Sequence, residues 1–148
     1  MQIKAEIRRM TCEDLPEVMN IEREVFSDPW QEVMFQQELL AETAFVMEMV
    51  PDKELIGYLC GLQVLDEYMI TNIAIRKERQ HCGFGTMLLL YVIQILRNCK
   101  LKSCFLEVRS KNKAAINFYL KHNFETFGAR KNYYRDPVDD ALIIKLDL

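Results

Sequence analysis

Residues 79–86 read RQHCGFGT and lie between two apolar runs, MITNIAI at 69–75 and MLLLYVIQIL at 87–96. The first run has the length and composition of a buried strand, and the second those of a helix. The chain has 5 glycines, and two of them, Gly83 and Gly85, stand where that helix should begin. A helix N-terminus attracts anions, and glycine lets a phosphate approach the backbone closely. The strand, turn and helix together favour a pyrophosphate-binding loop.

Two common phosphate-binding motifs do not fit this loop. A Walker A motif needs Lys and then Ser or Thr after its last glycine, but Gly85 is followed by Thr86 and Met87. A dinucleotide-binding motif needs a third small residue, where this chain has Leu88. A glycine-containing turn that only starts a helix is therefore the alternative to a phosphate site, and the flanking sequence must decide.

Length and composition indicate one domain and exclude several kinds of ligand. Of the 148 residues, 50% are hydrophobic, so we expect a single core and one domain over residues 1–148. The net charge is -3 and no basic block occurs, so no direct binding of nucleic acid is expected. No apolar run approaches the roughly 18 residues of a membrane span, and none resembles a signal peptide. We expect a cytoplasmic protein without membrane association.

The five cysteines indicate reduced thiols. They form no C-x-x-C pair and are accompanied by only 2 histidines, so neither disulfides nor a metal site is expected. Cys82 adjoins the glycine turn and Cys104 begins a later apolar strand, but neither belongs to a recognisable set with His and a carboxylate. A cysteine nucleophile is therefore not favoured.

Hydrophobic periodicity predicts a mixed sheet covered by helices. Strands are expected at 3–9, 43–50, 55–65, 68–75, 103–108, 124–134 and 140–148. Helices are expected at 11–26, 31–42, 83–98 and 112–121. The second and third strands should pair as an antiparallel hairpin. The fold class is α/β in content (α+β type), with about seven strands and about four helices in an order that is not that of a Rossmann domain.

Gln80, Gly83 and Gly85 fit the Q/R-x-x-G-x-G/A motif of the GCN5-related N-acetyltransferase (GNAT) family, which the chain resembles over nearly its whole length. The matching blocks occur in order as VFSDPWQEVMFQQEL, NIAI, LEVRSKNKAAINFY, ARKNYY and DALIIKL. They look like the branch of the family that acetylates the N-terminal alanine of ribosomal proteins. The resemblance implies a GNAT fold whose central strands are splayed around acetyl-coenzyme A (acetyl-CoA).

The resemblance also implies which residues bind acetyl-CoA, the expected cosubstrate. Its pyrophosphate would bind the loop, at His81, Cys82, Gly83, Phe84, Gly85 and Thr86. Its pantetheine arm and acetyl carbonyl would bind the preceding strand, at Ile73, Ala74 and Ile75, and the N–H of Ile73 would be the oxyanion donor.

Two further positions near the cofactor are less clear from the sequence. His81 stands where close relatives usually carry Arg, so Arg79 and Lys77 are expected to supply charge beside the loop. Asn112 resembles the family residue that contacts the cofactor, but an ordinary helix N-cap explains it almost as well.

Glu107 is the candidate base. A free α-amine has a pKa near 7.7–8.0, so at neutral pH most of it is protonated and must lose a proton before it attacks a thioester. In SCFLEVR the Glu107 carboxylate alternates with apolar residues in a strand that should be central, and partial burial would make it a better proton acceptor. The alternatives are an edge-strand glutamate facing water, or one paired with Arg109. The match to the LEVR block of the family favours catalysis.

Tyr119 is the candidate that assists the leaving thiolate. It lies seven residues after Asn112, and in the family the tyrosine at this spacing points at the sulfur of the cofactor. A proton or a strong hydrogen bond from its hydroxyl would serve that role. The alternative is an aromatic side chain of the core, which helical spacing alone favours.

The resemblance implies that the acceptor is a protein N-terminus, most directly the N-terminal alanine of a small-subunit ribosomal protein. The segment EREVFSDPWQE and the connection between NYY and DD should border the acceptor groove. Acidic side chains there could attract a cationic N-terminus, although a solvated helix face explains at least two of Glu22, Glu24, Asp28 and Glu32. The alternatives are a lysine or small-amine acetyltransferase, or a coenzyme A-binding protein without turnover. We expect a monomer or weak oligomer.

Overall fold

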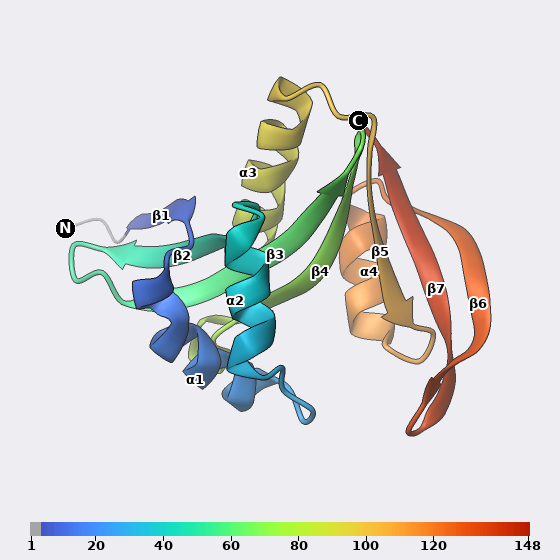
Figure 1. The fold of residues 1–148 in the computed structure, drawn as a ribbon, viewed down its shortest axis with the longest axis horizontal. Coiled ribbons are helices and arrows are strands. Elements are labelled where there is room, and N and C mark those ends of the chain that lie inside the picture. Colours follow the sequence, from blue (N-terminus) through green and yellow to red (C-terminus); the bar gives the residue numbers. More distant parts are fainter. Residues whose placement is uncertain (1–3) are drawn as a thin grey trace.

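The computed structural model describes residues 4–148, in which seven strands form a single mixed sheet (Figure 1). The order across the sheet is β1-β2-β3-β4-β5-β7-β6. The strands are β1 (Lys4–Arg9), β2 (Phe45–Val50), β3 (Leu55–Val64), β4 (Glu67–Ile75), β5 (Ser103–Arg109), β6 (Glu125–Arg135) and β7 (Val138–Asp147). The helices are α1 (Leu15–Val25), α2 (Glu32–Leu40), α3 (Phe84–Asn98) and α4 (Lys113–Lys121), with 3-10 turns η1 (Cys12–Asp14) and η2 (Lys77–Arg79).

The predicted types and order of the elements are confirmed, and the boundaries move for local reasons. The predicted start of the first strand at Ile3 lies outside the described residues. The first helix begins later than predicted because η1 precedes it, where the Thr11 N–H donates to an Asp14 carboxylate oxygen at 2.8 Å. The second helix ends at Leu40 rather than residue 42, because Glu42 has a left-handed backbone with φ 55°. The last hairpin extends further than predicted, to Arg135 and back from Val138.

The helices cover opposite faces of the sheet and define two cores. On one face, α1 and α2 pack over β2 and β3 around Val18, Phe35 and Tyr58. On the other face, α3 and α4 enclose a larger core that includes Leu89 and Leu106. Because side chains alternate along a strand, β2, β3 and β4 each contribute to both cores.

The central sheet divides where β4 meets β5. This is the parallel pair of the sheet, and its register runs only from Glu67–Ser103 to Met69–Phe105. Beyond Met69, β4 keeps its antiparallel partner β3 as far as Ile75, while β5 continues alongside β7. We call the gap that opens between the two strands the fork. Figure 1 shows β4 and β5 diverging from their common end. The predicted splay of the central strands is therefore confirmed.

Candidate active site

The backbone of β4 presents polar groups to the fork. In an antiparallel pair, residues that exchange hydrogen bonds alternate with residues that do not. The Arg76 N–H donates to the Ile56 carbonyl at 2.7 Å, and the register continues to Ala74 opposite Tyr58. The peptide groups of Ile73 and Ile75 therefore point away from β3 and toward the fork, where no β5 residue pairs with them.

Gln80, the first residue of the glycine motif, hydrogen-bonds to one of these groups. Its Nε2 donates to the Ile75 carbonyl at 2.9 Å. The side chain thereby fixes the loop to the end of β4 and takes up the carbonyl nearest to it. This contact leaves the N–H of Ile75 and, one step deeper in the fork, the N–H and C=O of Ile73 for a ligand.

The glycine loop leads into a helix start whose first N–H groups are unpaired within the helix. Gly83 is the N-cap of α3 with φ 89° and ψ 1°, and the first helical bond runs from the Met87 N–H to the Gly83 carbonyl at 3.1 Å. The N–H groups of Phe84, Gly85 and Thr86 therefore have no partner inside the helix. Their number and direction suit a phosphate.

The two glycines of the loop serve different purposes. A Cβ atom at Gly83 would meet nothing within 4 Å, so the left-handed φ of 89° is what calls for glycine there. A Cβ atom at Gly85 would lie 3.6 Å from the Phe118 ring and 3.8 Å from Ile75 Cγ1, which are ordinary contacts. Gly83 thus sets the path of the chain, whereas Gly85 leaves the helix start bare.

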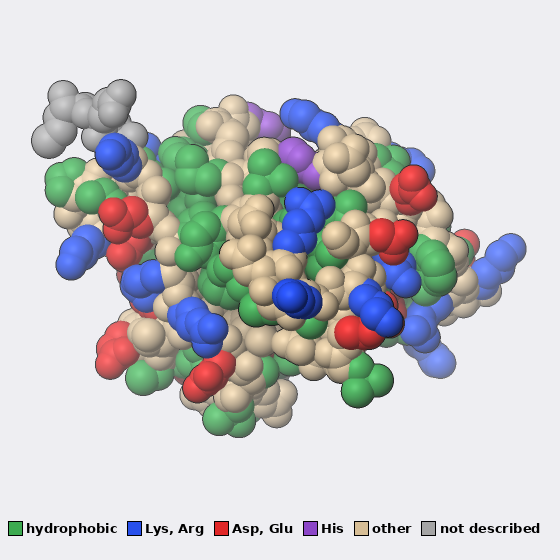
Figure 2. Space-filling view, turned by 90° about the horizontal axis from the view of Figure 1, so that it is seen from above, with side chains coloured by type: hydrophobic (Ala, Val, Ile, Leu, Met, Phe, Trp, Pro, Cys, Tyr) green, Lys and Arg blue, Asp and Glu red, His purple; other side chains and the backbone are tan. Residues whose placement is uncertain are grey.

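The side chains beside the loop differ from those predicted. Arg79, expected to supply charge to the loop, pairs instead with Glu54 at 3.0 Å. His122, which sequence reasoning missed, lies at the loop: its Nε2 is 3.1 Å from Thr86 Oγ1. Burial, followed by the charge of Lys121, lowers the pKa of His122. Figure 2 shows the histidine side chains at the surface beside Lys and Arg side chains.

Glu107 lies on the face of β5 that is turned toward the side of α1 and α2. Its side chain is 13% exposed, and Oε1 pairs with Arg130 Nε at 3.2 Å. Both alternatives to a catalytic role are wrong as stated, because β5 is flanked by β4 and β7 and because Arg109 binds elsewhere. Arg109 donates to the Pro137 carbonyl at 2.9 Å and lies over the Tyr134 ring at 4.2 Å.

Tyr119 belongs to the opposite face of β5. It is 3% exposed and packs with Phe118 and Phe124, whose ring centroids lie 5.1 and 5.2 Å from its own. It shares the α3 and α4 core with Cys104 and Leu106, which alternate with Glu107 along β5. Burial raises the pKa of the Tyr119 hydroxyl, so it stays protonated. Tyr119 is therefore a core aromatic in its packing, and its hydroxyl keeps its proton.

Asn112 is the N-cap of α4. Its Oδ1 accepts from the Ala115 N–H at 3.2 Å, so the capping explanation is confirmed. Capping uses the oxygen and leaves the amide nitrogen of Asn112 as a donor.

The acidic residues of the predicted acceptor side separate into two groups. Asp28 and Glu32 are exposed, as a solvated face requires. Glu24 accepts from the Lys77 N–H at 3.1 Å. Glu22 is only 1% exposed and is bound from inside the protein, so it cannot attract an acceptor as the sequence suggested.

Of the two cysteines beside the predicted site, Cys82 is exposed and Cys104 is buried. Burial raises the pKa of Cys104 to about 12, which leaves a poor nucleophile. Among residues 4–148, no three His, Cys, Asp or Glu side chains are grouped to hold a metal ion. Over the same residues, no helix is both long enough and apolar enough to cross a membrane.

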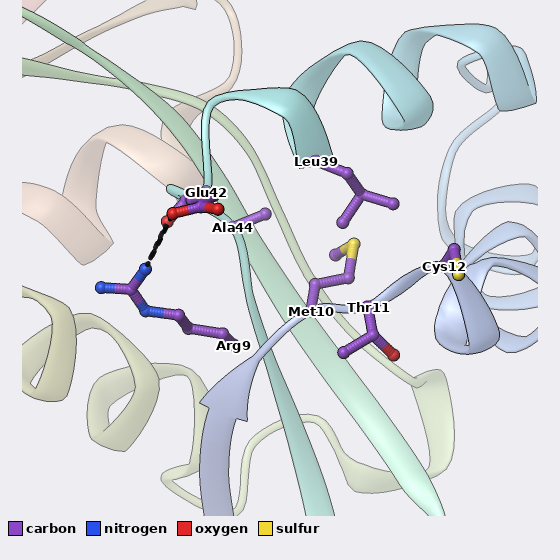
Figure 3. A pocket seen from close by; sticks show the side chains of 7 residues that line it. All are labelled: Arg9, Met10, Thr11, Cys12, Leu39, Glu42 and Ala44. Carbon is purple, nitrogen blue, oxygen red and sulfur yellow. Dashed lines mark hydrogen bonds and ion pairs between the residues drawn. The ribbon is translucent and has the colours of Figure 1, made fainter.

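A hollow of about 380 Å³ lies between the end of β1 and the end of α2, away from the fork (Figure 3). It is lined by Arg9, Met10, Thr11, Cys12, Leu39, Glu42 and Ala44. An ion pair of 3.8 Å between Arg9 and Glu42 crosses one side, and both side chains are exposed. The hollow contains no residue of the fork or the glycine loop, so we place no step of the chemistry there.

Known proteins resemble this chain in sequence and in structure. The ribosomal protein bS18-alanine N-acetyltransferase of Escherichia coli (strain K12) is 31% identical over 144 residues, which cover 96% of this chain and 97% of that protein. A Bacillus subtilis (strain 168) protein, provisionally assigned the same activity, is 37% identical over 147 residues, or 97% of this chain and 96% of that protein.

The crystal structure of the ribosomal-protein-S18-alanine N-acetyltransferase from Escherichia coli matches with a TM-score of 0.87 and 30% identity, covering 97% of this chain and 94% of that one. Arabidopsis thaliana NAA60 in complex with acetyl-CoA shares the fold, with a TM-score of 0.87, 17% identity, and coverage of 98% of this chain and 100% of that one. Residues 15–124 match the acetyltransferase (GNAT) family. With the fork and the glycine loop in place, the predicted family is confirmed: the chain belongs to the acetyltransferase (GNAT) family.

Proposed function

We propose that this chain transfers the acetyl group of acetyl-CoA to the α-amine of a protein N-terminus. The observation that carries the proposal is the fork, where the Ile73 N–H faces the gap, Glu107 lies on one face of β5, and Tyr119 of α4 lies in the core on the other face. An amine entering from the α1 and α2 side and a thioester entering from the α3 and α4 side would meet at this backbone.

The residues around the fork fit acetyl-CoA. The free N–H groups of Phe84, Gly85 and Thr86 would hold its pyrophosphate, with the backbone of His81, Cys82 and Gly83 completing the loop. The strand segment Ile73, Ala74 and Ile75 would align its pantetheine arm, and the amide nitrogen of Asn112 would bind it at the start of α4. When bound, the cosubstrate supplies an activated acetyl group.

Each catalytic group has one task in a direct transfer. Glu107 accepts the proton that the amine must lose, which lets the nitrogen attack the thioester carbonyl. The Ile73 N–H stabilises the oxyanion of the tetrahedral intermediate. Tyr119 donates a hydrogen bond or a proton to the departing sulfur, so that the products are an amide and a thiol.

The names of the relatives support a ribosomal acceptor, the N-terminal alanine of a small-subunit ribosomal protein. The exposed carboxylates Asp28 and Glu32 lie in and beside the α1–α2 connection, where they would favour a cationic N-terminus. Acetylation of lysine or small amines, and coenzyme A binding without turnover, are the competing functions.

Mass spectrometry of acetylated peptides tests the proposal. The enzyme and acetyl-CoA are incubated with peptides that begin with Ala or with other residues, and with matched peptides whose α-amine is blocked and whose lysines are free. We expect acetate on the free α-amine, most efficiently on Ala. Acetate mainly on lysine side chains would defeat the N-terminal proposal, and tight binding of acetyl-CoA with no release of thiol for any amine would favour a binding protein.

A further inference from the structure

A buried carboxylate joins three separate elements on the face of the sheet that α1 and α2 cover, which we call the acceptor face. Glu22 of α1 accepts hydrogen bonds from the Tyr58 hydroxyl of β3, from Asn72 Nδ2 of β4 at 2.7 Å, and from the Trp30 N–H of the α1–α2 connection at 3.0 Å. Glu22 is 1% exposed. Within residues 4–148 no Lys or Arg pairs with Glu22, so hydrogen bonds alone satisfy the buried group.

The position of Asn72 gives this carboxylate its importance. Asn72 immediately precedes Ile73, whose N–H is the proposed oxyanion donor. The segment just before it is irregular, because Asn72 pairs with Cys60 while Ile70 pairs with Gly61, which leaves Thr71 as an extra residue in β4. Side-chain bonds must therefore hold a stretch of β4 where the ladder to β3 is interrupted and the ladder to β5 has ended.

A second buried carboxylate holds the same irregular stretch. Thr71 Oγ1 donates to Glu38 Oε1 of α2 at 2.9 Å, and Glu38 is 6% exposed. Each helix of the acceptor face thus contributes one buried carboxylate to the two residues that precede the oxyanion donor. Glu22 differs from Glu38 in also binding the connection between the helices, through Trp30.

A buried carboxylate destabilises the fold unless its hydrogen-bond donors keep their positions. Burial of a carboxylate is unfavourable by several kcal/mol unless donors satisfy it, so the three donors must stay in place together. A shift of the α1–α2 connection at Trp30 therefore disturbs the same carboxylate that fixes Asn72. Glu22 therefore couples the α1–α2 connection, which would border the acceptor, to β4, which would bind the acetyl carbonyl.

We infer that Glu22 is a positioning residue for acetyl transfer. It holds the Ile73 N–H in place through Asn72, and it holds the α1–α2 connection in place through Trp30. The inference rests on the proposed function. It assigns no contact between Glu22 and either substrate.

Three single variants separate positioning from simple stabilisation. Asn72→Ser cuts only the link to β4, Glu22→Gln weakens both links, and Tyr58→Phe removes a donor to the same carboxylate while leaving both links intact. We would measure kcat, the KM of an Ala-terminated peptide, the affinity for acetyl-CoA by calorimetry, and thermal unfolding of each variant.

Positioning predicts a distinct pattern. Asn72→Ser should lower kcat roughly 10- to 100-fold with the peptide KM nearly unchanged, because a small displacement of a catalytic donor is costly. Glu22→Gln should lower kcat similarly and also raise the peptide KM. Tyr58→Phe should lower the unfolding temperature without the loss of kcat. The affinity for acetyl-CoA should stay within about twofold in all three, because no hydrogen bond of Glu22 involves a residue of the loop that would bind pyrophosphate.

Two results would overturn the inference. One is a folded Glu22→Gln enzyme with kcat within about twofold of wild type, since the catalytic donor would then not depend on Glu22. The other is a Tyr58→Phe enzyme that loses as much kcat as Asn72→Ser, which would reduce Glu22 to a stabilising role. The ratios are read on any amine that the wild-type enzyme acetylates. Failure of the wild type on α-amines would instead count against the proposed function.

Discussion

The glycine loop and the fork are built in opposite ways. The loop consists of consecutive residues, and its binding groups are peptide N–H groups whose direction follows from one left-handed residue, Gly83, and the start of α3. The fork brings together β4, β5 and α4, and the two side chains to which we assign catalytic roles, Glu107 and Tyr119, come from different elements on different faces. The loop should therefore tolerate side-chain changes that the fork does not. Mutations in the two regions test this difference.

The largest effect is expected at Glu107. Glu107→Gln should lower kcat/KM by roughly 10²- to 10⁴-fold near neutral pH, and the deficit should shrink as pH rises because more of the amine is already deprotonated. Rates would be measured from about pH 6 to 9.5, a span that brackets the amine pKa, under conditions where chemistry limits turnover. Wild-type rates throughout would exclude Glu107 as an essential base.

A smaller loss is expected at Tyr119, on the cofactor side of the fork. Tyr119→Phe keeps the ring packed between Phe118 and Phe124 and deletes only the hydroxyl, so kcat should fall by roughly 10- to 100-fold with little change in stability. Unlike the Glu107 defect, this one should persist at high pH and diminish with a more acidic leaving thiol. A variant with full activity would return Tyr119 to a purely structural role.

The loop should respond in affinity rather than in turnover. Gly83→Val and Gly85→Val should each weaken acetyl-CoA binding, roughly 10-fold or about 1.4 kcal/mol, by crowding the bare helix start. Gly83→Val should also cost about 1–2 kcal/mol in unfolding free energy because of its left-handed backbone, a cost that Gly85→Val does not carry. Calorimetry and thermal unfolding measure the two quantities. Unchanged affinity in both folded variants would remove the pyrophosphate from this loop.

The smallest effect is expected at Glu38, beneath the fork. Burial raises the pKa of Glu38 above its usual 4.5, and within residues 4–148 its Oε2 has no hydrogen-bond partner. When folding raises the pKa of a carboxyl, the protein loses stability as pH rises from about 4.5 through the pKa of the folded state. The reason is that the carboxyl ionises at lower pH in the unfolded chain than in the folded one. Glu38→Gln should therefore raise the unfolding temperature at pH 7.5 by a few degrees, about 2–4 °C per kcal/mol. The gain should shrink by pH 5, and a constant difference would contradict it.

What the sequence could predict follows the same division between local and distant contacts. The order of elements, the glycine loop and the Asn112 cap depend on neighbouring residues and were predictable. The pairing of Glu107 with Arg130, the contact of His122 with Thr86, and the diversion of Arg79 to Glu54 join distant segments, and no local pattern indicates them.

Glu22 is an intermediate case. It lies four residues after Val18 on α1, so helical spacing could have indicated a buried position. We instead expected Glu22 to belong with acidic residues that attract an acceptor or form a solvated helix face, and that expectation was wrong for this residue. An acidic residue in an apolar stripe signals a buried group with partners. Its three donors come from β3, β4 and the α1–α2 connection, and only the fold could identify them.

The end of the β4–β5 register at Met69 and Phe105 has a consequence for how the enzyme can change over time. Within a ladder, hydrogen bonds fix the spacing of two strands at about 4.8 Å, whatever side chains they carry. Beyond that point no ladder sets the width of the gap, so the bulk of core residues behind it does. A change of one methylene at Leu106 or Leu89 would widen or narrow the fork, while every proposed catalytic group is retained. Substrate range can therefore drift through mutations in the hydrophobic core.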